Sequence, residues 1–361
     1  HFRIVLCYTN PMTTNTSHIP KGIDPIFEKA KELGASDVHI ATGAPIMFRV
    51  DGILLPQTEQ PITADHAMQL TKMTLGDLAW KRLEKERELD SSYQLKDGTR
   101  LRVNTAFERG NPTLTARIIP TEIPTIEQLG LEEIAGIICN HHEGLVLFTG
   151  PTGSGKSTSL AALIHSIQLA RPINLITLED PIEFLFPQAQ GIVRQREYGE
   201  DFFSFAEGLK RVLRQDPDVV MVGEIRDPET IAAALTLAET GHLIFATLHT
   251  PNTMQTVDRI VDVFPAYQQA QVRSQLSMSL KGIVAQRLVP HAQSGRVALR
   301  EVLLNTPAVA NIIRDNRPQE LKSVLQTSED IGMIAFEKSA KRMREAELIS
   351  QETFDFIMAT I

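Results

Sequence analysis

The chain has 361 residues, of which 42% are hydrophobic and 22% are charged, with 21 glycines and 20 prolines. These values exclude a disordered or fibrous protein, and the length predicts two domains that each bury a core. The formal net charge of −8 gives no broad attraction to a polyanion, so we expect no nucleic-acid partner.

The number of cysteines and the length of the apolar runs narrow the class of protein further. Cys7 and Cys139 stand far apart, so neither a disulfide framework nor a paired-cysteine zinc motif is predicted. The apolar runs fall short of the roughly 20 residues that cross a bilayer. We therefore expect a cytoplasmic protein without a membrane-spanning segment, and we set residues 1–22 aside as a tag or disordered extension.

Residues 23–119 are predicted to form a small α+β domain. Apolar residues recur at helical spacing over residues 23–33. A longer amphipathic stretch covers residues 63–89, with Thr63 as a candidate N-cap and a candidate break at residues 74–76. Strand-like runs cover residues 37–41, 46–50, 93–95, 99–107 and 114–119.

A segment containing proline and glycine, residues 120–130, is predicted to be a hinge linker. Beyond it, in residues 131–361, strands and helices alternate, which predicts a mostly parallel sheet with helices on both faces and a helical C-terminal part. Helices are expected at residues 131–140, from 156, at 203–214 and at 228–240. Strands are expected at residues 145–149, 174–178, 219–222, 242–247, 282–288 and 297–304.

Residues 150–158 match the phosphate-binding pattern G-x-x-x-x-G-K-[ST] between an apolar strand and a helix. Lys156 is expected to neutralise phosphate oxygens, and the Ser157 hydroxyl to bind Mg²⁺. The flanking elements disfavour the alternative of an ordinary Gly-rich turn, so the sequence predicts an enzyme that binds Mg²⁺-ATP and hydrolyses it. The candidate nucleotide-binding residues are Gly150, Pro151, Thr152, Gly153, Ser154, Gly155, Lys156, Ser157 and Thr158.

Acidic residues follow two apolar strands of the second domain. Glu224 ends one of them, where it is expected to act as a general base or to position the attacking water; a helix-capping acid is the alternative. Glu179 ends the other and is assigned to water or metal positioning. Asp180 and Glu183 are assigned to the strand edge or to a neighbouring arginine. For Glu183 alone, a solvated or salt-bridged role and a catalytic role are equal alternatives.

Two histidines and two arginines complete the candidate set. His242 and His249 flank a strand, and either is a candidate sensor of the γ-phosphate, although a lone histidine at a strand end is usually structural. Arg102 and Arg117 lie on predicted strands of the first domain. Arginine matches phosphate oxygens and can complete a phosphoryl-transfer site from a neighbouring domain or subunit, but surface strand arginines are an equal alternative.

Taken together, these residues resemble the ATPases that drive type II secretion and type IV pili, most closely the PilT/PilU retraction branch, over residues 23–361. The markers of the resemblance are residues 35–39 (Ala-Ser-Asp-Val-His), the phosphate loop, an acidic box at 178–183, Gly-Glu-Ile-Arg-Asp at 223–227 and a histidine box at 238–249.

The resemblance implies an α/β chain in which a PAS-like N-terminal domain precedes a RecA-like ATPase core. It implies a ring of six subunits with ATP at the subunit boundaries. Lys156 and Ser157 then bind phosphate and Mg²⁺, and Glu224 is the catalytic acid. Glu179 and His242 complete the site. Two arginines of the N-terminal domain, Arg102 and Arg117, also reach the nucleotide.

The direction of such a motor is read from two further features. The chain lacks the four-cysteine element and the extra N-terminal region of extension and secretion members, which favours retraction. Against this, the retraction motif Ala-Ile-Arg-Asn-Leu-Ile-Arg-Glu appears at residues 308–315 with Ala310 in place of its first arginine. This departure leaves three alternatives open, which are a principal retraction motor, an accessory one and a specialised paralogue.

We therefore expect a hexameric motor at the inner face of the cytoplasmic membrane. It would power pilus retraction and twitching motility through a membrane platform protein, and a paralogous ATPase could share the work. The alternatives are a pilus extension or type II secretion ATPase, a non-motor nucleotide switch, and a RecA-type nucleic-acid translocase. The acidic charge balance disfavours the last of these.

Overall fold

The computed structural model describes residues 22–119 and 122–361. The chain divides into two compact units, His1–Thr121 (unit 1) and Glu122–Ile361 (unit 2). The division falls inside the predicted linker, whose role as a hinge stays a prediction. The extension expected at residues 1–22 lies outside the described residues except for Gly22.

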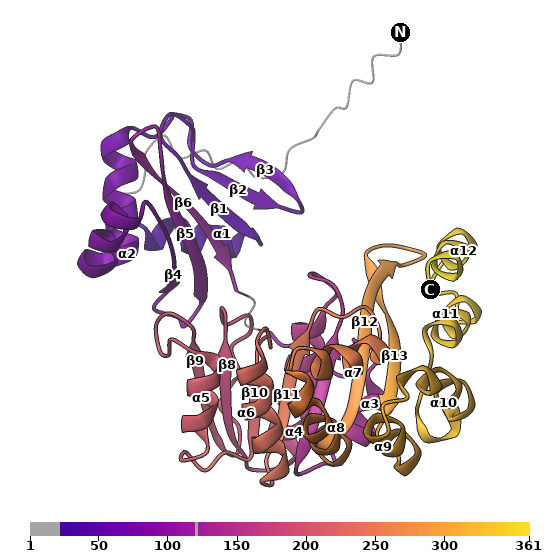
Figure 1. The fold of residues 1–361 in the computed structure, drawn as a ribbon. Coiled ribbons are helices and arrows are strands. Elements are labelled where there is room, and N and C mark those ends of the chain that lie inside the picture. Colours follow the sequence, from indigo (N-terminus) through magenta and orange to yellow (C-terminus); the bar gives the residue numbers. More distant parts are fainter. Residues whose placement is uncertain (1–21, 120–121) are drawn as a thin grey trace. The chain divides into compact units, whose positions relative to one another are not determined.

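Unit 1 contains one antiparallel sheet and two helices, α1 (Asp24–Glu32) and α2 (Ala64–Glu86) (Figure 1). The sheet order is β3-β2-β1-β6-β5-β4. Its core joins α1, α2 and the sheet through buried side chains such as Phe27, Phe48 and Leu101. The strands are β1 (Asp37–Ile40), β2 (Met47–Val50), β3 (Ile53–Pro56), β4 (Glu88–Gln94), β5 (Arg100–Glu108) and β6 (Asn111–Ile118).

The helix signals of unit 1 are confirmed, whereas two strand predictions need correction. Thr63 caps α2 by accepting a hydrogen bond from the His66 N–H, and Gly76 breaks the helix with φ 70° and ψ 175°. Arg87, at φ 70°, ends α2, so β4 begins at Glu88 inside the stretch predicted to be helical. The sequence pattern missed β3 because all four of its side chains are exposed, which leaves no alternation to detect.

Unit 2 is built on a seven-stranded sheet in the order β13-β12-β7-β11-β10-β8-β9. Neighbouring strands are parallel except for the β12–β13 hairpin. The predicted, mostly parallel sheet is therefore confirmed. The strands are β7 (Gly144–Thr149), β8 (Asn174–Glu179), β9 (Ile192–Glu197), β10 (Val219–Val222), β11 (Leu243–Leu248), β12 (Leu280–Pro290) and β13 (Arg296–Leu304).

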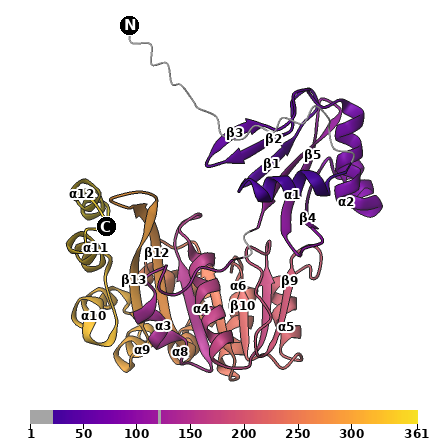
Figure 2. The same cartoon turned by 180° about the vertical axis from the view of Figure 1, so that it is seen from behind.

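Helices cover both faces of this sheet. Figures 1 and 2, which view the chain from opposite sides, place α3 (Glu132–Ile138) and α4 (Lys156–Ala170) on one face, and α5 (Phe205–Val212) and α6 (Pro228–Glu239) on the other. Near the hairpin lie the C-terminal helices. The remaining helices are α7 (Thr253–Asp262), α8 (Ala266–Ser279), α9 (Pro307–Arg314), α10 (Leu321–Thr327), α11 (Phe336–Glu345), α12 (Gln351–Thr360) and two short 3-10 helices, Pro318–Glu320 and Glu329–Ile331.

The central strands are buried along their whole length, which is why they read as apolar runs. Every residue of β7, β10 and β11 is buried. The sequence pattern missed the edge strand β9, because its residues are mostly polar and only partly buried. Among the described residues, no helix combines the length and the apolar character needed to cross a bilayer.

Candidate functional site

The phosphate-loop sequence connects β7 to α4, as its pattern predicts. Gly153 and Gly155 have φ values of 75° and 82°, a backbone conformation that residues with a Cβ rarely adopt. Nothing lies within 4 Å of the position that a Cβ would take on Gly153, so the loop leaves open space there. No side chain caps the N-terminus of α4, which leaves its first N–H groups for a ligand.

Lys156 is buried at the start of α4, with 8% of its surface exposed. Its Nζ donates to the carbonyl oxygens of Gly150 and Pro151, at 2.8 and 3.0 Å. Burial lowers the pKa of Lys156, and attraction to Glu224 and Glu183 opposes that shift. Within the described part of the chain the ammonium makes no ion pair, so a phosphate group fits here as its missing counterion.

The loop forms one wall of a cavity of about 510 Å³. The carboxyl ends of β8, β10 and β11 form the opposite wall, because parallel strands end at the same edge of the sheet. The cavity is lined by Thr152, Gly153, Ser154, Gly155, Lys156, Ser157, Thr158, Glu179, Asp180, Pro181, Glu183, Met221, Gly223, Glu224, Arg226, Thr247, His249, Leu288 and Arg296.

Glu224 presents a partly exposed carboxylate to this cavity, held at both oxygens. Arg226 donates to its Oε2 at 2.9 Å, and His249 Nε2 lies 3.0 Å from its Oε1. Burial raises the pKa of Glu224, but the hydrogen bonds and charges of Arg226 and His249 outweigh this effect and lower it. Arg226 also lies 3.6 Å from Asp180. An ionised Glu224 is therefore favoured at neutral pH.

Glu179 has a different environment, because it is only 2% exposed. Its Oε1 accepts from the Thr177 hydroxyl at 2.6 Å and from the Gln195 amide at 3.1 Å, and its Oε2 accepts from the Glu183 N–H at 3.4 Å. These donors are all neutral. Burial raises the pKa of Glu179 to about 7, against 4.5 for an ordinary glutamate, despite the hydrogen bonds.

The two histidines are separated by the full length of β11. His249 follows the carboxyl end of the strand and lines the cavity. His242 precedes its amino end, where Nδ1 lies 3.1 Å from the Thr240 hydroxyl and 3.0 Å from the Leu237 carbonyl. The structure therefore brings His249, and not His242, to Glu224 in this chain. The expected role of His242 gains no contact here and stays a prediction.

The sequence analysis gave no role in the site to Arg226, Leu288 and Arg296, which are among the residues that line the cavity. Arg226 follows Glu224 by two positions, and this short spacing was a signal in the sequence that the two side chains lie near each other. Leu288 and Arg296 come from the β12–β13 hairpin, more than a hundred residues beyond the loop. No local pattern connects them to the phosphate loop, so they were found only from the structure.

Comparison with known proteins identifies the family. The model of the family described as "Type II/IV secretion system protein" matches residues 13–354. The chain belongs to this family.

Relatives within the type II/IV secretion family refine the assignment. The type IV pilus retractation ATPase PilT of Pseudomonas aeruginosa is 41% identical over 319 residues, which cover 88% of this chain and 93% of that protein. A twitching motility protein of Neisseria gonorrhoeae is 43% identical over 320 residues, covering 88% and 85%. The crystal structure of the pilus retraction motor PilT with bound ADP has a TM-score of 0.86 at 40% identity, covering 93% and 96%.

The chain is accordingly an ATPase of the PilT type. The predicted fold, an N-terminal domain followed by a RecA-like core, is confirmed by the likeness to the solved PilT structure.

The candidate arginines of unit 1 lie on adjacent strands of its sheet. Arg102 on β5 and Arg117 on β6 are cross-strand partners, and both are exposed. Arg117 Nε donates to Asp37 Oδ1 at 2.8 Å. Burial raises the pKa of Asp37, but hydrogen bonds from Ser36 and Arg117 outweigh it and lower the pKa. The role of Arg102 and Arg117 at a nucleotide stays a prediction.

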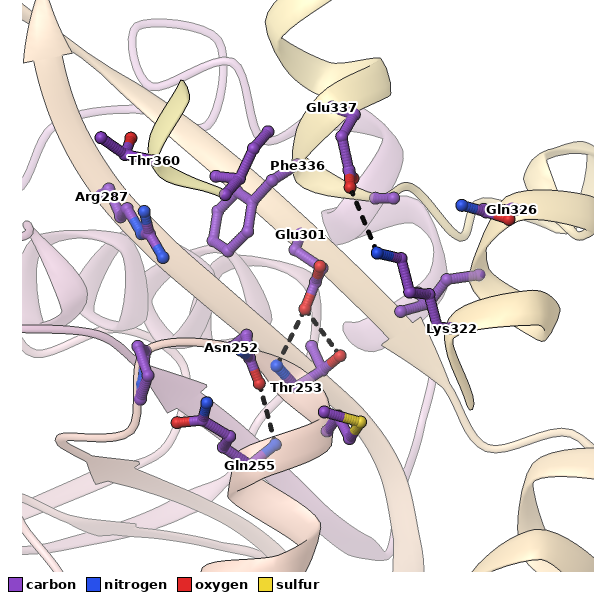
Figure 3. Close-up of a pocket in the computed structure, with 15 residues that line it drawn as sticks. Asn252, Thr253, Gln255, Arg287, Glu301, Lys322, Gln326, Phe336, Glu337 and Thr360 are labelled. Carbon is purple, nitrogen blue, oxygen red and sulfur yellow. Dashed lines mark hydrogen bonds and ion pairs between the residues drawn. The ribbon is translucent and has the colours of Figure 1, made fainter. Parts of the chain in front are cut away.

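A second cavity of unit 2, of about 310 Å³, lies between the start of α7, the β12–β13 hairpin and the C-terminal helices (Figure 3). The Glu301 carboxylate accepts from the Thr253 N–H at 2.9 Å and from its hydroxyl at 2.8 Å. Lys322 and Glu337 lie 3.9 Å apart across the cavity. Because Glu301 accepts from the Thr253 N–H and Asn252 from the Gln255 N–H, the N-terminus of α7 is capped, unlike that of α4.

The raised pKa of Glu179 predicts a specific dependence of stability on pH. Below pH 4.5 the carboxyl is protonated in both the folded and unfolded states; as pH rises toward 7, the unfolded state ionises first, and stability falls. Glu179→Gln removes this term. The free energy of unfolding of the variant, relative to wild type, should therefore rise by up to about 3 kcal/mol across that interval.

Urea denaturation between pH 4 and 8, a range that contains the interval from 4.5 to about 7, measures this difference. Glu229→Gln is the control, because Glu229 is exposed and shows any drift caused by losing a surface carboxylate. A flat difference for Glu179→Gln would mean that Glu179 titrates as an ordinary carboxyl.

Proposed function

We propose that this chain binds ATP with Mg²⁺ at residues 150–158 and uses its hydrolysis to retract a type IV pilus. The observation that carries the proposal is the meeting, in one cavity, of an uncapped helix N-terminus, a buried Lys156 that forms no ion pair with any described residue, and a charged Glu224. The names of the relatives support the retraction assignment, since one is a pilus retraction ATPase and a similar structure holds ADP.

The loop supplies the contacts to phosphate. Its N–H groups and the N-terminus of α4 direct positive potential into the cavity, and Lys156 exchanges two neutral carbonyl acceptors for phosphate oxygens. The Ser157 hydroxyl lines the cavity and would hold Mg²⁺. When bound, Mg²⁺ would offset negative charge on the phosphate oxygens.

A neighbouring cavity provides room for the base. It has a volume of about 380 Å³ and shares Thr152, Gly153, Ser154, Leu288 and Arg296 with the first cavity. Its other lining residues are apolar except for Arg287 and Thr360. A purine presents a flat apolar face, which favours a nucleotide over a simple polyphosphate as the ligand. Its apolar lining residues are Pro151, Leu288, Val289, Leu299, Phe356 and Ile357.

Glu224 is the proposed base or water-positioning group. It is partly exposed to the cavity, and Arg226 and His249 hold its carboxylate in place. Glu179 lies at the end of the neighbouring strand and is proposed to position water or metal. Because its pKa of about 7 lies near neutrality, Glu179 can also exchange a proton within the site.

The proposed assembly is a ring of six identical subunits in which Arg102 and Arg117 of one subunit reach the nucleotide of another. A motor of this kind would work at the inner face of the cytoplasmic membrane on a platform protein, with a paralogous ATPase as a further partner. The second candidate function is pilus extension or type II secretion. Ala310 in α9, where the retraction motif has arginine, bears on a different question, which is whether this chain has a principal, an accessory or a specialised role in retraction.

The first prediction from the proposed function concerns the chemical step of ATP hydrolysis. Glu224→Gln keeps the shape and one hydrogen-bond acceptor but removes the negative charge. We expect kcat for ATP hydrolysis to fall by about 10²- to 10⁴-fold while ADP affinity stays close to wild type. Steady-state ATPase assays and titration with a fluorescent ADP analogue measure the two quantities. Glu229→Gln, the same change at an exposed position outside the cavity, is the matched control.

The second prediction concerns the arginines. Arg117→Ala should lower ATPase activity, and mixing this variant with Glu224→Gln should give more activity than the average of the two. The reason is that a mixed ring contains sites with Glu224 from one subunit and Arg117 from its neighbour. Activity equal to the average, or a fully active Arg117→Ala protein, would contradict a role across subunits.

The third prediction concerns the direction of the motor. Cells whose only copy of the gene encodes Glu224→Gln should carry excess surface pili and lose twitching motility, because pili would extend without retraction. Electron microscopy of pilus number and a stab motility assay give the readouts. Bald cells would establish extension instead, and an unchanged number of pili would contradict a principal role in retraction.

A further inference from the structure

The β12–β13 hairpin places a buried polar side chain directly behind the phosphate loop. β12 pairs in parallel with β7, so that Ala285 lies opposite Thr149. The next residues of the two strands, Gln286 and Gly150, are therefore neighbours as well. Gln286 is only 1% exposed, and such a buried polar group is expected to have a defined hydrogen-bonding role.

The space behind both ends of the loop is taken by Gln286. A Cβ built on Gly150 would lie 2.2 Å from the Gln286 carbonyl oxygen, and a Cβ on Gly155 would lie 2.9 Å from its side-chain Nε2. At Gly150 the close atom belongs to the backbone, so only glycine fits; at Gly155 it is a side-chain atom, and the positive φ of 82° adds to the preference for glycine. The two ends of the loop therefore rest against the same residue, which fixes how close the loop lies to the sheet.

The hydrogen bonds of Gln286 reach the loop itself. Its Nε2 donates to the Ser154 carbonyl at 2.7 Å. Its Oε1 accepts from the Ser159 hydroxyl on α4 at 2.9 Å and from Arg300 Nε at 2.9 Å. Two donors face the amide oxygen and one acceptor faces the amide nitrogen. Only this orientation of the amide therefore satisfies all three hydrogen bonds, because a flipped amide would place its nitrogen against the two donors.

Arg300, the cross-strand partner of Gln286, holds that orientation from β13. It is 8% exposed and also donates to the carbonyl oxygens of Leu129 and Gly130, at 2.8 and 3.0 Å. Burial lowers the pKa of Arg300 to about 10. A buried cation held by neutral acceptors is costly, which suggests a requirement beyond packing.

The neighbouring residues on the hairpin face the other way. Side chains alternate along a strand, and Arg287 and Glu301 line the cavity drawn in Figure 3; Arg287 also lines the proposed base cavity beside the loop. The face that carries Gln286 and Arg300 is therefore directed toward the phosphate loop and α4, apart from that cavity.

We propose that Gln286 is a positioning residue of the nucleotide site, which orients the Ser154 peptide so that the N–H groups of the loop point at phosphate, and that Arg300 holds Gln286 in place. The inference rests on the proposed nucleotide site and names a residue outside the loop that determines its affinity.

Gln286→Glu separates positioning from packing. The carboxylate still accepts from Ser159 and gains an ion pair with Arg300, so folding without nucleotide is maintained. It loses the donor to Ser154, however, and sets a negative oxygen against that carbonyl. We expect about a tenfold or greater loss of ADP affinity and a rise in KM larger than the fall in kcat, with an unchanged or higher urea midpoint.

The measurements are titration with a fluorescent ADP analogue, steady-state kinetics, and urea unfolding without nucleotide. Gln286→Met, which keeps the length of the side chain but has no donor, is the second variant and should also lose affinity. Ser159→Ala is the matched control. It removes one hydrogen bond from the same amide and leaves the Ser154 contact, so ADP affinity should stay near wild type.

The outcomes distinguish this inference from the proposed function. Wild-type protein that fails to bind ADP would overturn the proposed function itself. Wild-type binding with equally tight binding by folded Gln286→Glu and Gln286→Met would overturn only the role of Gln286. Failure of both variants to fold would make Gln286 a core residue and overturn the proposal as well.

Discussion

Parallel pairing of β7, β11, β10 and β8 is the constraint on which the rest of unit 2 depends. Because these strands run in one direction, their carboxyl ends meet at one edge of the sheet. The register pairs Leu248 with Thr149 and Val222 with both Leu178 and Ala246, so β10 ends next to β8 and only two residues short of β11. The phosphate loop, Glu224 and His249 lie in one cavity for this reason.

The close approach of strand ends also explains a glycine before the acid. An added Cβ on Gly223 would lie 3.2 Å from the Glu179 Cα, tighter than most side chains tolerate. The Thr247 hydroxyl donates to the Gly223 carbonyl from the strand on the other side. Glycine therefore allows the ends of β8, β10 and β11 to pack together, which brings the acids of the site near each other.

Two glutamates of the cavity differ because their surroundings differ. Glu224 contacts Arg226 and His249, and the pKa of its carboxyl falls; Glu179 is buried among neutral donors, and its pKa rises to about 7. Acids whose pKa values are pushed apart are suited to different tasks. Their surroundings therefore favour a charged Glu224 and a Glu179 that is protonated more readily.

The sequence by itself determined the chemistry of the loop and the class of the fold. Residues 150–158 carry their glycines, lysine and hydroxyl within one short segment, and the buried central strands read as apolar runs, so local pattern was sufficient. The break at Gly76 and the cap at Thr63 were readable for the same reason, since each depends on backbone preferences of a few neighbouring residues.

Only the tertiary structure decided which distant residues meet the loop. His242 and His249 look equivalent in sequence, but six residues of extended strand lie between them, and only His249 is at the carboxyl edge. Gln286 reaches Ser154 from 132 positions away, through strand pairing that no local pattern encodes. Strand order and register are set by packing over the whole sheet, which is why they lie beyond what spacing along the chain can predict.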